Sequence, residues 1–149
     1  MLLNADMKQL IENHRAGMVA TTNDDGTPSV SPKATFVILN DEAIAFGNIR
    51  SPGTLANIRK RPRIEICFID VVLRKAVRVT GEASIIRKAD ADSQMKEAFE
   101  QEWATYVPHM SAFVKIDVNA SEMILSPAYD LGVAEEELRR TNLEKLNRL

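Results

Sequence analysis

The fold of this protein is decided by residues 63–86, which read RIEICFIDVVLRKAVRVTGEASII. Apolar and polar residues alternate along this stretch, most regularly in its second half. The apolar set there is Val77, Val79, Gly81, Ala83 and Ile85. A period of two residues is typical of a strand with one buried face. The stretch therefore predicts two antiparallel strands, 63–70 and 76–86, joined by a short hairpin turn.

Shorter β-prone segments flank this hairpin on both sides. They are 17–22, 28–39, 43–47, 112–118 and a short extended piece at 122–125. The Asp25-Gly26 step is a strong hairpin signal between the first two segments. Asn40-Asp41-Glu42 has turn composition before the third segment. The first three segments are therefore expected to form a meander.

Helical periodicity and capping residues predict helices between and after the strands. The first follows Asn4 or Asp6, the second opens at Ser51-Pro52 and ends before Pro62, and the third follows Asp90 or Asp92 and runs to Tyr106. A tail at about 133–149 has helical composition. Its leucine stripe is imperfect, so we expect it to pack on a partner or to fray rather than to join the core.

These elements predict an α+β, mainly β protein: six or seven antiparallel strands that close into a small split barrel, with two or three flanking helices. The 149 residues, 45% of them hydrophobic, suit a single domain, 1–149, followed by the helical tail. No apolar run approaches the ~20 residues that cross a bilayer, and the N-terminus lacks signal-peptide features. We therefore expect a cytoplasmic protein that does not bind membranes.

Composition also excludes several kinds of site. Cys67 is the only cysteine, and His14 and His109 are far apart, so no metal site is expected. The net charge of −2 argues against a nucleic-acid-binding surface. A basic run, 59–63, lies at a helix C-terminus, where the helix dipole already stabilises basic residues. No catalytic triad is evident.

The sequence Ser51-Pro52-Gly53-Thr54 has the chemistry of an anion site. With Ser51 as N-cap, Pro52 takes the first helical position, and the next amides have no backbone partner. Those amides, the helix dipole and two hydroxyl groups favour a phosphate, and Arg50 adds charge. An ordinary capped helix without a ligand explains the same residues.

A second polar set lies on one predicted strand. Alternation places Ser29, Ser31, Lys33 and Thr35 on one face of residues 28–39. A solvated face would explain this pattern. In a meander, however, the strand 43–47 would deliver residues 48–54 beside that face. Polar groups that converge from two segments beside apolar residues are typical of a cofactor pocket.

At these residues the sequence resembles the FMN-binding split-barrel superfamily, the pyridoxamine-phosphate-oxidase-like proteins, from about Met7 to about Leu125. Several motifs carry the resemblance. They are Asp24-Asp25-Gly26-Thr27-Pro28, Ser31-Pro32-Lys33-Ala34-Thr35-Phe36, residues 48–57, Arg61-Pro62-Arg63-Ile64 and Arg78-Val79-Thr80-Gly81-Glu82-Ala83.

The resemblance implies a homodimer with two FMN sites at the subunit interface. It implies that the isoalloxazine rests on residues 31–36 and that the phosphate lies against Arg50, Ser51 and Thr54, near Lys33. The implied cofactor-binding set is Ser31, Pro32, Lys33, Ala34, Thr35, Asn48, Arg50, Ser51, Thr54 and Trp103. Trp103 would approach the flavin from the partner subunit; alternatively, it is a hydrophobic helix anchor.

The sequence also departs from true pyridoxamine phosphate oxidases. It has Pro52-Gly53 where they usually have an Arg-Lys pair, and its end lacks their arginine- and histidine-containing segment. Vitamin B6 oxidation is therefore not expected. The expected function is FMN-dependent transfer of hydride or electrons from a reduced nicotinamide, NADH or NADPH, to a small acceptor. The alternative is a non-catalytic flavin- or haem-related binding or stress protein.

Overall fold

Two long strands form the centre of the sheet, as the sequence predicts. In this computed structural model, which describes residues 2–149, they are β5 (Arg63–Asp70) and β6 (Lys75–Arg87). They pair antiparallel along the whole of β5. The side chains that β5 buries on one face are Ile64, Ile66 and Phe68. The alternation in the sequence thus becomes the inner face of the sheet.

The next strand, β7 (Ala112–Leu125), pairs with β6 along its whole length. The prediction of two separate pieces, 112–118 and 122–125, is wrong because a β-bulge between Thr80 and Gly81 absorbs one residue of β7 and lets pairing continue. Gly81 is required at this point. A Cβ there would lie 2.4 Å from the backbone oxygen of Asp117.

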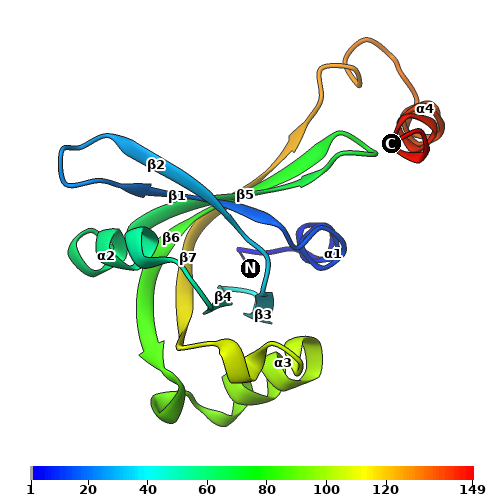
Figure 1. Cartoon of the computed structure of the whole chain (residues 1–149). Helices are drawn as coiled ribbons and strands as arrows, with labels where there is room; N and C mark the ends of the chain where they lie inside the picture. The colour runs from blue at the N-terminus through cyan, green and yellow to red at the C-terminus, as the bar shows by residue number, and fades with distance from the viewer. Residues whose placement is uncertain (1) are drawn as a thin grey trace.

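The complete sheet has seven antiparallel strands in the order β2-β1-β5-β6-β7-β4-β3 (Figure 1). The remaining strands are β1 (Gly17–Thr22), β2 (Pro28–Lys33), β3 (Phe36–Asn40) and β4 (Ala43–Asn48). The expected single strand 28–39 is thus divided in two, and its halves form opposite edges of the sheet. Only residues 34–35 join those edges, so the sheet curls into a split barrel but does not close.

A side chain at the break explains why the strand divides. Thr35 Oγ1 donates a hydrogen bond of 2.8 Å to the backbone oxygen of Gly47 and accepts one of 3.1 Å from its amide. These bonds attach the chain to β4 at this corner. The residues after it therefore pair with β4, whereas those before it pair with β1.

Three helices cover the sheet where the sequence predicts them. They are α1 (Ala5–Asn13), α2 (Pro52–Lys60) and α3 (Ser93–Trp103). The Asn4 side chain caps α1, and Asp92 caps α3. The third helix ends at Trp103, earlier than the predicted Tyr106, where the chain turns into a short 3-10 segment. Stacking of Phe99 on Phe113, with ring centroids 4.2 Å apart, fixes α3 against the sheet.

The tail forms a fourth helix, α4 (Glu135–Asn147), beside the tip of the β5–β6 hairpin and away from the barrel (Figure 1). None of the helices between residues 2 and 149 is both long enough and apolar enough to cross a membrane.

Candidate functional site

The start of α2 presents donors that have no partner within the helix. Ser51 occupies the N-cap position and Pro52 the first turn, and the first intrahelical bond runs from the Leu55 amide to the Ser51 oxygen, at 3.0 Å. The amides of Gly53 and Thr54 have no backbone acceptor in the described chain. The Ser51 hydroxyl makes no capping bond, so it too is available. Together with the helix dipole, these groups favour an anion.

Strand β2 brings its polar face to this helix start. Ser31 Oγ lies 3.2 Å from Thr54 Oγ1, and Lys33 Nζ donates to Ser31 Oγ at 2.9 Å. All three residues are half-buried. Two hydroxyl groups and an ammonium group therefore lie next to the free amides of α2. We call Ser31, Lys33 and Thr54 the polar cluster.

Lys33 gives the polar cluster an uncompensated positive charge. No carboxylate in residues 2–149 lies within ion-pair distance of its ammonium group. Burial lowers the pKa of Lys33 below its ordinary value, because partial loss of water disfavours the charged form. An anion bound here would compensate the charge and the lost hydration.

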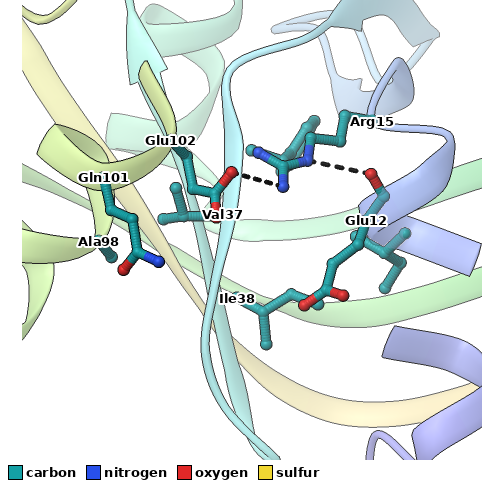
Figure 2. Close-up of a pocket in the computed structure, with 9 residues that line it drawn as sticks. Glu12, Arg15, Val37, Ile38, Ala98, Gln101 and Glu102 are labelled. Atoms are coloured by element: carbon teal, nitrogen blue, oxygen red, sulfur yellow. Dashed lines mark hydrogen bonds and ion pairs between the residues drawn. The ribbon is translucent and has the colours of Figure 1, made fainter. Parts of the chain in front are cut away.

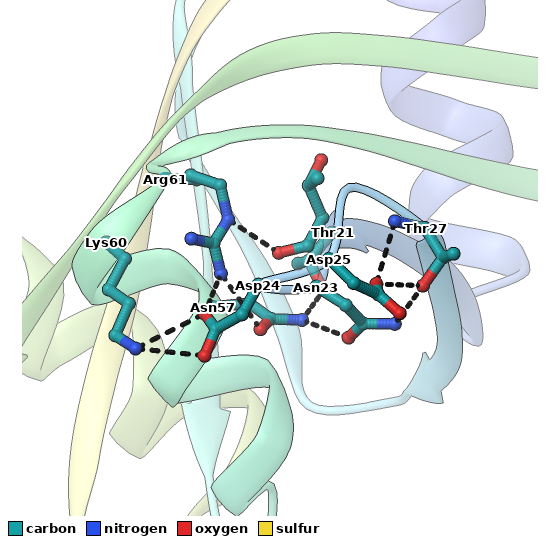
Figure 3. A network of polar contacts seen from close by, with 9 residues as sticks. Thr21, Asn23, Asp24, Asp25, Thr27, Asn57, Lys60 and Arg61 are labelled. Atoms are coloured by element: carbon teal, nitrogen blue, oxygen red, sulfur yellow. Dashed lines mark hydrogen bonds and ion pairs between the residues drawn. The ribbon is translucent and has the colours of Figure 1, made fainter.

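A network at the other end of α2 holds the helix against the β1–β2 turn (Figure 3). The side-chain Nδ2 of Asn57 donates to Thr21 Oγ1 at 3.0 Å and to Asn23 Oδ1 at 2.9 Å. Asp24 forms ion pairs with Lys60 at 3.0 Å and Arg61 at 2.7 Å, and these partners lower the pKa of Asp24. The network fixes both elements that supply the polar cluster.

Replacing Asn57 by leucine should lower the melting temperature by several degrees. The change leaves the buried Thr21 hydroxyl and the Asn23 oxygen without their donor, which costs about 1–3 kcal/mol. For a chain of this size each kcal/mol corresponds to roughly 2–4 °C. The control is Lys60→Gln, which breaks only an exposed ion pair worth about 1 kcal/mol or less. Equal melting temperatures for the two variants would show that the Asn57 contacts do not hold α2.

Asn48 carries the one buried side-chain oxygen or nitrogen atom in residues 2–149 that lacks a hydrogen-bond partner. Its Nδ2 donates to Ser111 Oγ at 2.7 Å, whereas Oδ1 accepts from nothing. Asn48 ends β4, three residues before the N-cap of α2. Because an unsatisfied buried carbonyl is costly, a donor from a ligand would be favourable here.

The other residues that the sequence predicts for the site have different surroundings. The Thr35 hydroxyl already forms two hydrogen bonds with the backbone of Gly47. Pro32, Ala34 and Arg50 are exposed, and the Arg50 side chain forms no hydrogen bond or ion pair within residues 2–149. They border the site through their positions in the chain: two adjoin Lys33, and the third precedes the N-cap.

Trp103 is held by its own chain, away from the polar cluster. Its indole Nε1 donates to the backbone oxygen of Phe36 at 2.9 Å, and the Arg15 guanidinium lies 5.4 Å from its ring centroid. Arg15 also pairs with Glu102 at 2.8 Å across a small pocket between α1, β3 and α3 (Figure 2). That pocket, of about 90 Å³, is too small for a flavin. A contact from Trp103 to a flavin in a partner subunit remains a prediction.

Two residues of this region, Asn57 and Ser111, were not identified from the sequence as site residues, although they position it. Of the two, only Asn57 could have been suspected from the sequence. It is a polar residue next to Ile58, which lies on the buried apolar face of the short helix α2. Thr35 was identified, but its hydroxyl forms hydrogen bonds with the backbone of Gly47. The arrangement as a whole can bind an anion. No three His, Cys, Asp or Glu side chains in residues 2–149 gather as metal ligands.

Comparison with known proteins places this arrangement in a family context. A family model described as pyridoxamine 5'-phosphate oxidase matches residues 3–125. No curated protein matches the chain significantly. The crystal structure of HupZ from Group A Streptococcus is 27% identical, with 83% of this chain and 94% of that chain covered and a TM-score of 0.70.

Two further structures share the fold at lower identity. An FMN-binding protein from Syntrophomonas wolfei is 12% identical, with 84% of this chain and 87% of that chain covered and a TM-score of 0.67. General Stress Protein 26 from Bacillus anthracis is 19% identical, with coverages of 83% and 95% and a TM-score of 0.65.

Proposed function

The chain belongs to the pyridoxamine 5'-phosphate oxidase family, and on this premise we propose that it binds FMN, with the phosphate at the polar cluster and the start of α2. The observation that carries the proposal is the half-buried ammonium of Lys33, which has no ion-pair partner in the described chain and donates to Ser31 Oγ at 2.9 Å. Ser31 Oγ in turn lies 3.2 Å from Thr54 Oγ1 at the start of α2, where the Gly53 and Thr54 amides have no backbone acceptor. Such a set suits a dianionic phosphate group better than a carboxylate, because it offers several donors around one position.

The residues around the polar cluster also fit the rest of FMN. The unpartnered Oδ1 of Asn48 can accept a hydrogen bond from a ribityl hydroxyl or from the imide N–H of the ring. Ser51 and Arg50 supply a free hydroxyl and a second positive charge next to the helix start. In the proposed complex the isoalloxazine rests on residues 31–36.

The site in one chain is open, which supports the proposal that two copies build it. Val30 is 58% exposed and Pro32 is exposed on the outer face of β2, the same strand that carries Ser31 and Lys33 inward. Apolar residues beside a cofactor site usually become covered. We therefore propose a homodimer with one flavin at each end of the interface.

Bound FMN would supply the redox chemistry, accepting hydride from a reduced nicotinamide and passing electrons to a small acceptor. The protein's own contribution is to bind the phosphate, orient the ring and limit water. The polar cluster contributes an ammonium group and two hydroxyl groups, which can donate hydrogen bonds to the phosphate and compensate its charge.

The test is the visible spectrum of the purified protein, followed by titration of the flavin-free protein with FMN. Binding is expected at roughly micromolar concentration or below. Loss of the oxidised flavin band on addition of NADH or NADPH would support a reductase. FMN that is retained but not reduced by either donor would favour a binding or stress protein, and a protein that binds no FMN would contradict the proposal.

FMN affinity should fall as the pH rises into the alkaline range. In the free protein the pKa of Lys33 lies below its ordinary value. The phosphate favours the charged ammonium, so the complex has the higher pKa. Above the free-state pKa, binding requires proton uptake, and affinity falls by up to about tenfold per pH unit. Titrations between about pH 7 and about pH 10 measure this slope.

The matched control for this pH dependence is Lys33→Met, which keeps the aliphatic length and removes the titrating group. This variant should bind FMN more weakly, and its affinity should change less between about pH 7 and about pH 10. In this variant only the FMN itself still ionises over that range. Parallel profiles for the two proteins would show that Lys33 does not contact the phosphate.

A further inference from the structure

A second pocket, of about 400 Å³, lies between α1 and the end of the sheet formed by the β5–β6 hairpin and β7. Helix α1 packs against β5 and β6 (Figure 1). The pocket shares no residue with the polar cluster. Pockets that hold small molecules measure roughly 300–1,000 Å³ and combine apolar walls with a few polar groups. This pocket is large enough for a small organic ligand.

One wall of the pocket is a single face of α1. Asp6, Gln9, Leu10 and Asn13 follow the spacing i, i+3, i+4 and i+7, which places them on the same side of a helix. Leu10 is buried against the core, and the three polar residues are exposed around it. Gln9 Nε2 donates to Asn13 Oδ1 at 3.2 Å. The wall therefore has an apolar centre and a polar rim.

The opposite wall is one face of the sheet. Asp70 on β5 pairs with Lys75 on β6, and Lys75 pairs with Leu125 on β7, so these residues form a row across three strands. Met123 lies two residues before Leu125 and therefore on the same face. Leu73, in the hairpin turn, completes the wall. Three apolar side chains and two charged ones thus face α1.

The C-terminal segment holds the sheet wall in place. The Tyr129 hydroxyl donates to the Leu73 oxygen at 2.5 Å, and Lys75 Nζ donates to Glu135 Oε1 at 2.6 Å. The Lys75 ammonium also lies 5.6 Å from the Tyr129 ring centroid. Residues 126–149 lie beyond the part matched by the family model. The support for this pocket therefore comes from a segment outside the matched region.

The charge around the pocket is negative. Asp70 is only 8% exposed, and its Oδ2 lies 3.2 Å from His14 Nε2. The hydrogen bond to Glu135 raises the pKa of Lys75, and the nearby charge of Asp6 adds to the rise. Asp6 has no ion-pair partner within residues 2–149. Three carboxylates thus stand against two groups that can be positive, so the net charge is negative whether or not His14 is protonated.

We propose that this pocket binds a small organic cation, an ammonium group carried on an apolar body. The ammonium group pairs with the Asp6 carboxylate and donates to the side-chain oxygen of Gln9, which accepts no hydrogen bond in the described chain. The apolar body lies against Leu10, Met123 and Leu125. An anion of the same shape would be repelled by the surplus negative charge, and a neutral ligand would leave Asp6 without a partner.

The test uses two probes with the same apolar body and opposite charge, phenethylamine and hydrocinnamate. Amide chemical shifts of the isotope-labelled, full-length protein report where each probe binds. Phenethylamine should shift the amides of residues 6–14, 70–75 and 123–125, with a dissociation constant of roughly a millimolar or below. Hydrocinnamate should leave them unchanged at the same concentration. Binding of neither probe, or equal binding of both, would overturn the proposal.

Reversing one charge tests the role of Asp6. Asp6→Lys should raise the dissociation constant of phenethylamine by about tenfold or more and allow hydrocinnamate to bind. Asp6→Asn should weaken phenethylamine binding in the same direction. The matched control is Glu12→Lys, at an exposed position of the same helix that does not line this pocket, and it should stay within about twofold of the wild type. Equal affinities of Asp6→Lys and Glu12→Lys for phenethylamine would contradict the proposal.

The support from the C-terminal segment is tested by Tyr129→Phe. Loss of the hydrogen bond to the Leu73 oxygen should loosen the sheet wall and weaken phenethylamine binding by about twofold to tenfold. Tyr106→Phe is the control, because the hydroxyl of this exposed tyrosine forms no hydrogen bond within residues 2–149. If the two variants bind phenethylamine equally well, the C-terminal segment does not shape the pocket.

Discussion

Lys33→Glu is expected to weaken FMN binding by about a hundredfold or more. The change removes a charge-assisted hydrogen bond worth about 1.5–3 kcal/mol and places a carboxylate where the phosphate should lie. A loss of about 3 kcal/mol corresponds to more than a hundredfold in the dissociation constant. Fluorescence titration of the flavin-free variant measures it directly.

The matched control is Lys96→Glu, which makes the same change in net charge at an exposed lysine of α3 that has no ion-pair partner within residues 2–149. It should bind FMN as the wild type does. Equal losses in the two variants would mean that overall charge, rather than the polar cluster, governs binding. An unaffected Lys33→Glu would remove Lys33 from the phosphate site.

Phe46→Ala is expected to have the largest effect on stability, about 3–5 kcal/mol. Phe46 is fully buried in β4, every residue of which is buried, and its ring lies 5.3 Å from that of Phe36. Removing the ring leaves a cavity between three strands. Thermal unfolding followed by circular dichroism should show a melting temperature lower by roughly 6–20 °C.

The comparison variant is Phe46→Leu, which retains most of the buried apolar volume and should lose clearly less stability. If Phe46→Ala melts within a few degrees of the wild type, the Phe46 ring does not contribute to the core as its burial indicates. Saturating FMN should raise the melting temperature of the folded variants by mass action.

The central strands and the helices could be predicted because their signals are local. The period-two alternation of 63–86 gives β5 and β6, and Ser51-Pro52 marks the start of α2. The β2–β3 break could not be predicted, because alternation of polar residues continues through Thr35 and the two corner residues, Ala34 and Thr35, are neither glycine nor proline. Its cause is a contact with Gly47, twelve residues further along the chain.

The polar cluster was predicted for a partly wrong reason. A meander was expected to place residues 48–54 beside β2, but β4 and β2 are separated by four strands in the sheet. The two segments meet because Asn57 and Asp24 hold α2 against the β1–β2 turn. These long-range side-chain contacts have no periodic signature in the sequence. The contact of Trp103 could not be predicted for the same reason. Its indole Nε1 donates to the backbone oxygen of Phe36, which lies 67 residues away in the chain.

The continuous β7 strand shows how a local signal can mislead. The sequence predicts two pieces, 112–118 and 122–125, with residues 119–121 between them. Pairing with β6 nevertheless continues on both sides of these residues, because a bulge between Thr80 and Gly81 accommodates the one extra residue of β7. The resulting β6–β7 ladder runs from the Lys75–Leu125 pair to the Arg87–Ala112 pair.

The comparison of FMN with riboflavin tests the phosphate site most directly. The two ligands share the ring and the ribityl chain and differ only in the phosphate, so their affinity ratio isolates the contribution of the polar cluster and the α2 amides. Titration of the flavin-free wild type should give a dissociation constant for FMN at least about a hundredfold lower than that for riboflavin. Equal affinities, or binding of neither ligand, would contradict a flavin phosphate site at Ser31, Lys33 and Thr54.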